Sequence, residues 1–526
     1  MVVVLCGSVA LTACGGSPSS SGRPSAESTG RTSSTAVTVP SSPAGQQLEW
    51  LINAIKNLPL STHEISAHFD PAFLAKIRPA HVNSALEALD PNGEAMTVVQ
   101  LTKVESTALE AYVRIGSRRH SVSLAVDPSG LIEGLLFLAL TPSSATCANP
   151  GAAEPCATAL QLQHAYDLEP LYAKGLDGAG ITIVVLAGII SPTIVHDLAV
   201  FDQAFDLRTP SIRVVSPTGQ QAQFNPGSTE DLGLASELTG DVEAAHTMAP
   251  GANIVVLVSP GIFTSEAMEV SWEASAVRYA AEHGLGQVVT SSLGNGTESA
   301  LGVGTIDQLH QDFQYAAAHH VSVIHASGDK GASYGYPSSD PLVTAVGGTR
   351  LHLDIAGNRT GPDAVFNDPS LGLASGGGLS TVFSRPSYQD SVQSVVGDHR
   401  GGPDVSMSAD FYDGFEWYES FGGAGWYDGG GTSVSAPLFS GIAAIADQAA
   451  GHPLGPLNPY LYRAYQLPGH GGLVPVTSGN STITTRSTNG STVTINGYRA
   501  TPGYNLATGL GTIDAEKLVM TLVHFR

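Results

Sequence analysis

The chain has 526 residues and a formal net charge of −23, from 23 Lys and Arg against 46 Asp and Glu. This excess of acid argues against a nucleic-acid-binding protein, whose surface has to neutralise phosphates. Hydrophobic residues make up 42% of the chain and charged residues 13%, and there are 60 glycines, which indicates a globular, turn-rich protein with room for two or three domains. An excess of carboxyl groups also suits work in acid, because protonation removes their mutual repulsion.

Residues 1–14, MVVVLCGSVALTAC, form a short apolar run followed by small residues, which predicts an export segment rather than a membrane span. The stretch LTAC resembles a bacterial lipobox, so we expect Cys14 to carry a lipid and the protein to be extracellular or held at the cell envelope. No Lys or Arg precedes the run, which departs from a usual export signal; the alternative is an uncleaved apolar end. Residues 15–44 are rich in Ser, Thr, Gly and Pro, as in a flexible tether.

Residues 45–142 show helical spacing first, as in LEWLINAIKNL, and then four alternating strand segments that end with LIEGLLFLAL. Helices followed by a meander predict a small α+β domain. Its layout resembles the NTF2-like domains that precede serine hydrolases in some actinobacterial envelope proteins, and the alternative is a propeptide that chaperones and inhibits the next domain. In the linker 143–156, Cys147 and Cys156 flank a loop rich in small residues, which favours a disulfide in an exported chain.

From residue 157 the pattern changes to short apolar segments, such as GITIVVLAG and ANIVVLVS, that alternate with amphipathic helices. This alternation predicts an α/β fold: a doubly wound parallel sheet covered on both faces, with its site at the carboxyl ends of the strands. Near the C-terminus, TITTRSTNGSTVTI predicts a hairpin that turns at Asn489-Gly490.

The stretch GGGTSVSAP at 429–437 has the features of a turn that presents a nucleophilic serine. Because Pro437 favours a helix's first turn, we expect Ser433 at or just before a helix N-terminus, where free N–H groups stabilise a negative oxygen. The alternative for this stretch alone is a glycine loop with a capping residue. A serine hydroxyl needs a base, and the HGT segment that supplies histidine in subtilisins is absent from the sequence.

Carboxyl groups offer a replacement for that histidine. Glu237 and Asp241 lie four residues apart and so share one helical face, where one of two close carboxyl groups keeps its proton. Asp329 follows a buried strand and a glycine; in an apolar site it stays protonated and donates to an oxyanion. Taken singly, the pair also fits a solvated helix, and Asp329 also fits an Asx turn.

Together these segments resemble the sedolisin family of serine-carboxyl peptidases over 157–526. ELTGDVEAAHTMAP, SGDKGASYGYPSSDPLVTAVGGT, GPDVSMSAD and GGTSVSAP occur in the family's order. The resemblance implies a subtilisin-like fold and an acid-active serine endopeptidase that acts on peptides or proteins, without nucleic acid and as a monomer. It assigns Ser433 as nucleophile, Glu237 as general base, Asp241 as its partner and Asp329 as oxyanion donor. Endopeptidase and tripeptide-releasing action both stay open.

The family also binds calcium near the C-terminus, through two aspartates and backbone carbonyls. Here the two aspartate positions hold Pro475 and Asn505. Calcium prefers carboxylate oxygens, so we expect no tight site and no other cofactor, although Asn505 and the carbonyls of Val476 and Gly503 remain weak ligands.

Two further interpretations compete with the peptidase. The first is a non-catalytic cell-envelope protein that binds partners through a retired peptidase fold; the four intact site residues argue against it. The second is a histidine-dependent subtilisin relative that uses His246. That histidine lies nine residues after Glu237, and therefore on another face of the helix.

Overall fold

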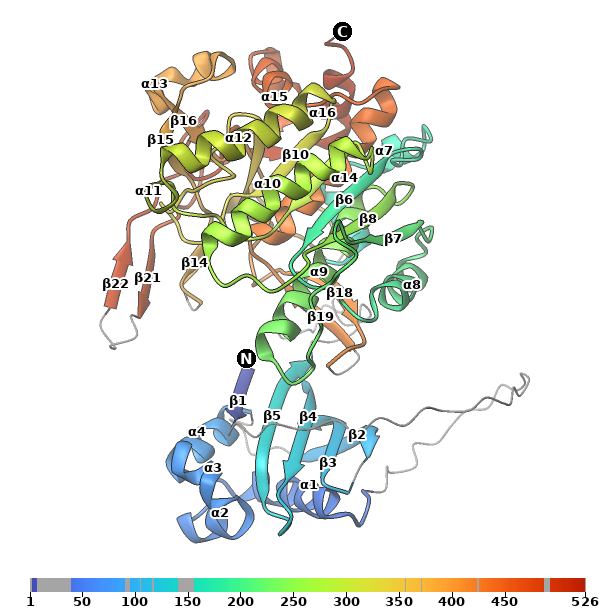
Figure 1. Cartoon of the computed structure of the whole chain (residues 1–526), viewed down its shortest axis with the longest axis vertical. Coiled ribbons are helices and arrows are strands. Elements are labelled where there is room, and N and C mark those ends of the chain that lie inside the picture. Colours follow the sequence, from blue (N-terminus) through green and yellow to red (C-terminus); the bar gives the residue numbers. More distant parts are fainter. Residues whose placement is uncertain are drawn as a thin grey trace, which may run out of the picture. The chain divides into compact units, whose positions relative to one another are not determined.

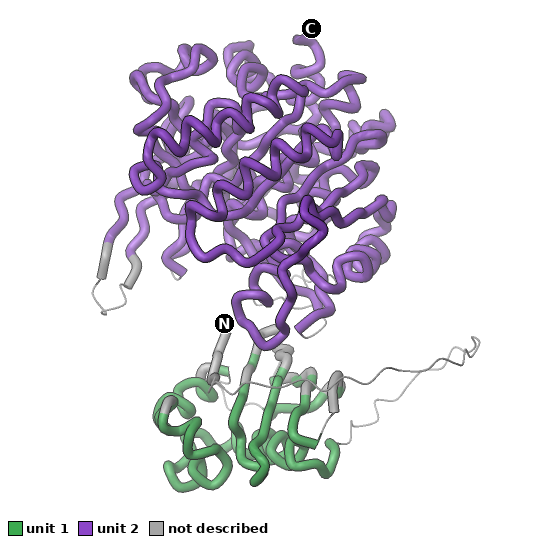
Figure 2. The backbone as a smooth tube through the Cα atoms, viewed as in Figure 1, with its two compact units in different colours: residues 1–142 green, residues 143–526 purple. Residues whose placement is uncertain are grey.

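The computed structural model divides the chain into two compact units, residues 1–142 and 143–526 (Figure 2). Expected features at Cys14, Cys147 and Asn489-Gly490 lie outside the residues that it describes. Those residues are 2–6, 39–89, 95–104, 106–115, 118–140, 156–354, 356–369, 371–422, 425–486 and 492–525.

The first unit has helices before strands, in the order that the sequence predicts. Its helices are α1 (Pro43–Ala54), α2 (Thr62–His68), α3 (Pro71–Lys76) and α4 (Pro79–Leu89), with the 3₁₀ turn η1 (Ile55–Asn57). Ser61 and Glu64 form a capping box that starts α2. The antiparallel sheet has the order β1-β5-β4-β3-β2. Its strands are β1 (Val2–Cys6), β2 (Met96–Val104), β3 (Ala108–Ile115), β4 (Arg118–Val126) and β5 (Ile132–Leu140).

The second unit is built on an eight-stranded sheet, with the order β12-β11-β10-β9-β6-β8-β7 and with β17 beside β11 (Figure 1). All pairs in it are parallel except β11 with the edge strand β12, as the α/β pattern predicts. Its strands are β6 (Thr182–Ala187), β7 (Ile212–Val215), β8 (Asn253–Val258), β9 (Val288–Ser291), β10 (Ser322–Ala326), β11 (Val343–Arg350), β12 (Ala364–Val365) and β17 (Val405–Ser408).

Helices cover both faces of this sheet. The longer ones are α8 (Ile194–Phe205), α9 (Thr229–Met248), α10 (Glu266–Glu282), α12 (Val303–Ala318) and α14 (Thr432–Ala450). In Figure 1, α10 and α12 lie side by side, and α9 and α14 pack together on the opposite face. Alternate residues of β6 enter two separate cores: Ile183 faces the α9 and α14 side, and Val184 faces α10 and α12. A Cβ on Gly441 would lie 2.5 Å from the Cβ of Met248, so the glycine permits the close approach of α14 to α9.

Shorter elements complete the unit, and none of the helices in the described ranges is long and apolar enough to cross a bilayer. The short helices are α6 (Ala159–Ala165), α7 (Glu169–Tyr172), α11 (Glu298–Leu301), α13 (Gln393–Val396), α15 (Asn458–Tyr465), α16 (Ala515–Leu522), η2 (Ser387–Val392) and η3 (Pro468–Gly472). The short strands pair as β13 (Asn367–Asp368) with β14 (Leu373–Ala374), β15 (Gly378–Ser384) with β16 (His399–Gly402), β18 (Phe415–Glu419) with β19 (Gly425–Gly429), and β20 (Leu473–Val474) with β23 (Thr512–Ile513).

The structure tests two further expectations from the sequence, the hairpin near the C-terminus and the position of Pro437. The predicted hairpin is present as β21 (Ile483–Arg486) paired antiparallel with β22 (Thr492–Ile495). The expected place of Pro437 is wrong: α14 begins at Thr432, so the proline lies beyond the first turn, inside the helix. Because a proline has no N–H, the carbonyl four residues earlier, that of Ser433, loses its helical hydrogen bond.

Candidate active site

A cleft of about 260 Å³ opens at the carboxyl ends of β9 and β10. One wall is the chain that follows β9, and the other is the chain that follows β10. The first two residues of α14 also line it. This is where a parallel sheet places its functional loops. The lining residues are Ser292, Leu293, Gly294, Asn295, Ala326, Ser327, Gly328, Asp329, Lys330, Ser333, Thr432 and Ser433.

Ser433 is the second residue of α14, and its side chain lies close enough to Glu237 of α9 to lower the pKa of that carboxyl group by hydrogen bonding. Its backbone carbonyl, which Pro437 leaves free, lies 3.0 Å from the hydroxyl of Ser292. The structure therefore brings the expected nucleophile and the expected base together, and it holds the backbone of the serine with a hydroxyl from the end of β9.

Glu237 and Asp241 lie one turn apart on α9, where Asp241 is only 4% exposed and Glu237 is partly buried. Burial raises the pKa of Glu237, and the negative charge of Asp329 raises it further, while the hydrogen bond from Ser433 opposes both. Burial and then the charge of Glu237 raise the pKa of Asp241 well above its ordinary value, against a hydrogen bond from Ser292. Burial and mutual repulsion therefore favour a state in which the two carboxyl groups together hold one proton.

Asp329 sits two residues beyond Ser327, at the end of the strand–turn segment that follows β10. Its Oδ1 accepts hydrogen bonds from Thr432 N at 2.8 Å and Thr432 Oγ1 at 2.9 Å. Burial raises the pKa of Asp329, against those two bonds and the charge of Lys330. Since Oδ1 is occupied by two donors, the proton belongs on Oδ2, the oxygen nearest Gly431, where a Cβ would lie only 2.7 Å away.

His246 does not join this group, although it lies on the same helix. Its Nε2 is 2.8 Å from Asp202 Oδ1 of α8, and both side chains are buried away from the cleft residues. The structure thus gives no support to a base at His246.

Sequence reasoning missed Ser292 and Thr432; a polar residue directly after a buried parallel strand was the available signal for Ser292.

Comparison with known proteins matches the second unit to peptidases. A family described as "Subtilase family" matches residues 225–467. Kumamolisin of Bacillus sp. (strain MN-32) is 32% identical over 394 residues, which is 71% of this chain and 64% of the relative. Pseudomonas sedolisin, a serine-carboxyl proteinase solved with two molecules of pseudo-iodotyrostatin, superposes with a TM-score of 0.58 and 25% identity, over 71% of this chain and 99% of that one. The second unit, called the sedolisin unit below, is similar to members of the sedolisin family.

Other relatives extend this picture of the sedolisin unit. Tripeptidyl-peptidase 1 of Rattus norvegicus is 30% identical over 360 residues, 62% of this chain and 57% of the relative. The aligned part is thus less than two thirds of the length of either curated relative. The first unit matches, over residues 39–132, a family described as "ORF 12 gene product N-terminal". Its NTF2-like layout stays a prediction.

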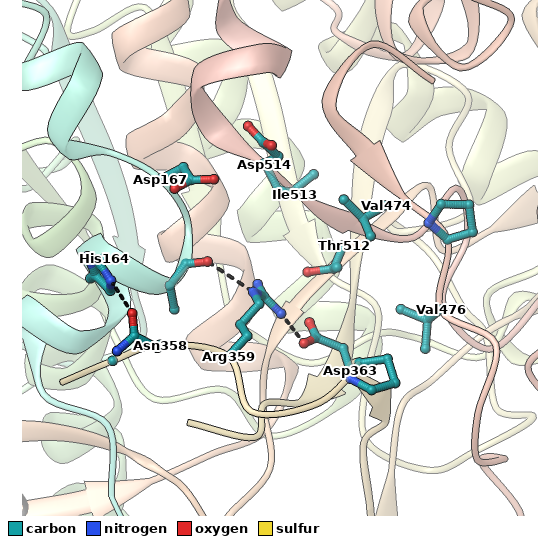
Figure 3. Close-up of a pocket in the computed structure, with 14 residues that line it drawn as sticks. His164, Asp167, Asn358, Arg359, Asp363, Val474, Val476, Thr512, Ile513 and Asp514 are labelled. Atoms are coloured by element: carbon teal, nitrogen blue, oxygen red, sulfur yellow. Dashed lines mark hydrogen bonds and ion pairs between the residues drawn. The ribbon is translucent and has the colours of Figure 1, made fainter. Parts of the chain in front are cut away.

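A larger cavity, of about 400 Å³, lies elsewhere in the sedolisin unit and contains none of the four expected site residues. Figure 3 shows Arg359 paired with Asp363 on one wall and Val474 and Val476 on another. Pro475, at one of the family's calcium-ligand positions, also lines it. Groups of three or more His, Cys, Asp or Glu side chains suited to a metal ion do not occur in the described part of the chain.

Proposed function

We propose that this protein is an acid-active serine endopeptidase in which Ser433 is the nucleophile and Glu237 the general base. The observation that carries the proposal is that the Ser433 hydroxyl lies close enough to the Glu237 carboxyl group to lower its pKa by hydrogen bonding, beside an open cleft. A serine hydroxyl becomes nucleophilic only with a base in contact, and Glu237 supplies one with a raised pKa. Asp329 lines the same cleft, and both Thr432 donors bind its Oδ1, which leaves Oδ2 to carry the proton that the neutral acid donates.

The reaction proceeds by acyl transfer. Ser433 Oγ attacks the peptide carbonyl while its proton passes to Glu237, and the oxygen of the tetrahedral intermediate accepts a hydrogen bond from protonated Asp329. Glu237 then gives the proton to the leaving amine, and an ester to Ser433 remains. Water attacks the ester, Glu237 takes its proton, and return of that proton to Ser433 releases the acid product.

The proton states set the working pH. Glu237 has to be ionised to accept a proton, while Asp329 has to be protonated to donate one. The population with both states declines as the pH falls, because Glu237 with its raised pKa becomes protonated, and it declines as the pH rises, because Asp329 becomes ionised. As the pH rises through the pKa of Asp329, the donor becomes a charge that repels the oxyanion, and activity declines.

We further propose export, with a lipid on Cys14 as an anchor. Cys156 is disulfide-bonded, which favours an oxidising compartment outside the cytosol. Mass spectrometry of the mature N-terminus tests both parts. A diacylglycerol-modified Cys14 at the first position supports the proposal, and an intact Met1 in the protein isolated from cells overturns it.

The decisive experiment for the activity is peptide cleavage between about pH 3 and 8 by the full chain and by Ser433→Ala and Glu237→Gln variants. We expect a maximum in acid, and a loss of at least about 10³-fold in each variant. A maximum above pH 7, or undiminished cleavage by Ser433→Ala, would sink the proposal. A folded chain that binds peptides but cleaves none would favour the binding-protein alternative.

A further inference from the structure

Lys330 places an unpaired positive charge in the wall of the active-site cleft. Among residues 156–525 the sequence has three lysines, and the other two are paired: Lys174 with Glu516, and Lys517 with Asp514. Lys330 is exposed and has no ion pair within the described ranges. In a chain with a net charge of −23, such a lysine is a local exception.

The backbone fixes where this charge stands. Asp329 O accepts a hydrogen bond from Ala374 N at 3.1 Å, and Gly331 N donates to Ala374 O at 3.2 Å. Lys330 is therefore held between two residues tied to β14, directly beside the expected oxyanion donor. Only Asp329 and Lys330 among the lining residues carry ionisable side chains. When Asp329 is protonated, as the reaction needs, Lys330 is the one net charge that the lining presents to a substrate.

No carboxylate in the described ranges forms an ion pair with Lys330. Glu269, for example, accepts a hydrogen bond at Oε1 from Gly294 N of the cleft lining, at 3.1 Å. A positive group in a partly desolvated cleft attracts an opposite charge and repels a like one. We propose that the cleft selects peptides with an acidic side chain near the scissile bond, through Lys330. This inference rests on the proposed peptidase function.

The test uses matched peptides that differ only in Glu, Gln or Lys, with the variable residue placed in turn at each position around the scissile bond. At about pH 5.5 the Glu side chain is ionised, and we expect kcat/KM to favour Glu over Gln at one position by about three- to tenfold. Lys330→Met should abolish the preference, and Lys330→Glu should reverse it in favour of Lys. Lys174→Met, which is not in the cleft lining, is the control and should keep the wild-type ratio. Because two peptides are compared with the same variant, the ratio of their kcat/KM values cancels any effect of Lys330 on the pKa of Asp329.

Cleavage measured at a second pH distinguishes recognition of the side chain's charge from recognition of its shape. At about pH 3.5 the Glu side chain is mostly protonated, so its advantage should vanish, while cysteic acid at the same position keeps its charge and its advantage. Equal cleavage of Glu and Gln peptides at every position, with cleavage itself intact, overturns the inference and leaves the peptidase. Absence of cleavage of all peptides counts against the proposed function, and the inference falls with it.

An independent observation concerns Asn505, at the other position where the family has a calcium-binding aspartate. This side chain is only 3% exposed. Its Oδ1 accepts three hydrogen bonds, from Ala507 N at 3.1 Å, Thr508 N at 3.0 Å and Thr508 Oγ1 at 3.1 Å. Three donors on one oxygen fix the orientation of the amide, because a flip would turn its NH₂ group toward other donors.

The NH₂ group of Asn505 therefore faces the carbonyl oxygens of Val476 at 3.4 Å, Thr501 at 3.4 Å and Gly503 at 3.5 Å. A ring of carbonyl oxygens needs a positive partner, which is a cation in a calcium site and an N–H donor here. Pro475 has no side-chain oxygen with which to bind a cation. We infer that the amide of Asn505 takes the place of the cation and ties residues 474–479 to 499–509 without metal.

Melting temperatures of the purified chain test this inference without reference to activity. Wild type should melt at the same temperature in millimolar calcium chloride and in chelator. Asn505→Asp turns a carboxylate toward the three carbonyls, so we expect a lower melting temperature in chelator and recovery by several degrees in calcium, more so with Pro475→Asp added. Asn458, another buried asparagine, donates to Val343 O at 2.9 Å; Asn458→Asp is the control and should not recover. A wild type stabilised by calcium, or an Asn505→Asp variant indifferent to it, overturns the inference.

Discussion

The hydroxyl of Ser292 lies 3.0 Å from the carbonyl oxygen of Ser433, at the point where Pro437 removes the helical hydrogen bond. The same hydroxyl lies 2.9 Å from Asp241 Oδ1. A hydroxyl has one hydrogen, so while Ser292 donates to Ser433, its contact with Asp241 needs the proton on the carboxyl group. This chain of contacts links the proton of the acid pair to the backbone of the expected nucleophile.

Ser292 is therefore expected to be a positioning residue for the reaction. In Ser292→Ala the carbonyl of Ser433 and the carboxyl group of Asp241 both lose a partner, and we expect kcat per active site to fall about tenfold to hundredfold with KM nearly unchanged. Ser292→Thr keeps the hydroxyl and should restore most of the rate. Counting active sites with a serine-directed inhibitor separates this from a loss of folded protein. Full kcat in Ser292→Ala would contradict the assignment.

Gly431 should be indispensable for two reasons: its backbone has a positive φ, and the carboxyl group of Asp329 lies against its Cα. Its φ is +94°, and a Cβ there would meet Asp329 Oδ2 at 2.7 Å. In Gly431→Ala the displaced carboxyl group no longer points at the oxyanion, so we expect a loss on the order of 10²–10³ in kcat. Gly451, at the other end of α14, also has a positive φ, +74°, but nothing within 4 Å of a built Cβ. Gly451→Ala should lose about 1 kcal/mol of stability and keep its kcat. Equal kcat in the two variants would refute the steric argument.

The sequence predicts the architecture well where one physical signal dominates. Short apolar runs that alternate with helices give the parallel sheet, and the carboxyl ends of β9 and β10 are where the cleft lies. The spacing of Glu237 and Asp241 predicts their shared face, because one helix carries both. These arguments are local, and their outcome depends little on the rest of the chain.

Contacts between distant segments could not be predicted in this way. Ser292 meets Ser433 across 141 residues, and Asn505 meets the carbonyl of Val476 across 29. Pro437 was expected in the first turn because the position of the helix start cannot be read to within one turn. The sequence alone identified Asn505 as a lost carboxylate; only the directions of its hydrogen bonds show an amide in the place of a cation.

Asp329→Asn should separate the donor role from the titration. The Asn side chain keeps an oxygen for the two Thr432 donors and puts an NH₂ group at the position of Oδ2, so it donates at every pH. Since the pKa of Asp329 is raised by burial, the wild type loses its donor as the pH rises through that pKa, and the variant does not. We expect lower activity than wild type in acid but a smaller decline toward pH 7. Asp329→Ala, without a donor, should lose about 10²–10³-fold throughout. If the activity of Asp329→Asn declines toward pH 7 as steeply as that of wild type, the decline has to come from the titration of another group.

Stability should also be greatest in acid, because the second unit buries several carboxyl groups in their neutral form. Burial raises the pKa of Glu416 to about 9, and of Glu419 and Asp447 to about 7. Glu416 is fully buried opposite Asp428, and neither of its oxygens has a hydrogen-bond partner within the described ranges. A group whose pKa is higher in the folded than in the unfolded state binds more protons when folded, so its stabilising effect is complete below the unfolded pKa and is lost as the pH rises toward the folded value.

We therefore expect the melting temperature to fall between about pH 4.5 and 8, measured by fluorescence of the full chain at constant ionic strength. Each unit of pKa difference corresponds to about 1.4 kcal/mol, and each of the three groups is raised by more than one unit, so the combined fall should exceed about 10 °C. Glu416→Gln cannot ionise, and it should flatten the slope at neutral pH, while the exposed Glu282→Gln should leave it unchanged. A melting temperature that rises from pH 4.5 to 8 would mean that ionised, not neutral, carboxyl groups stabilise the fold, and would remove the physical basis for an enzyme adapted to acid.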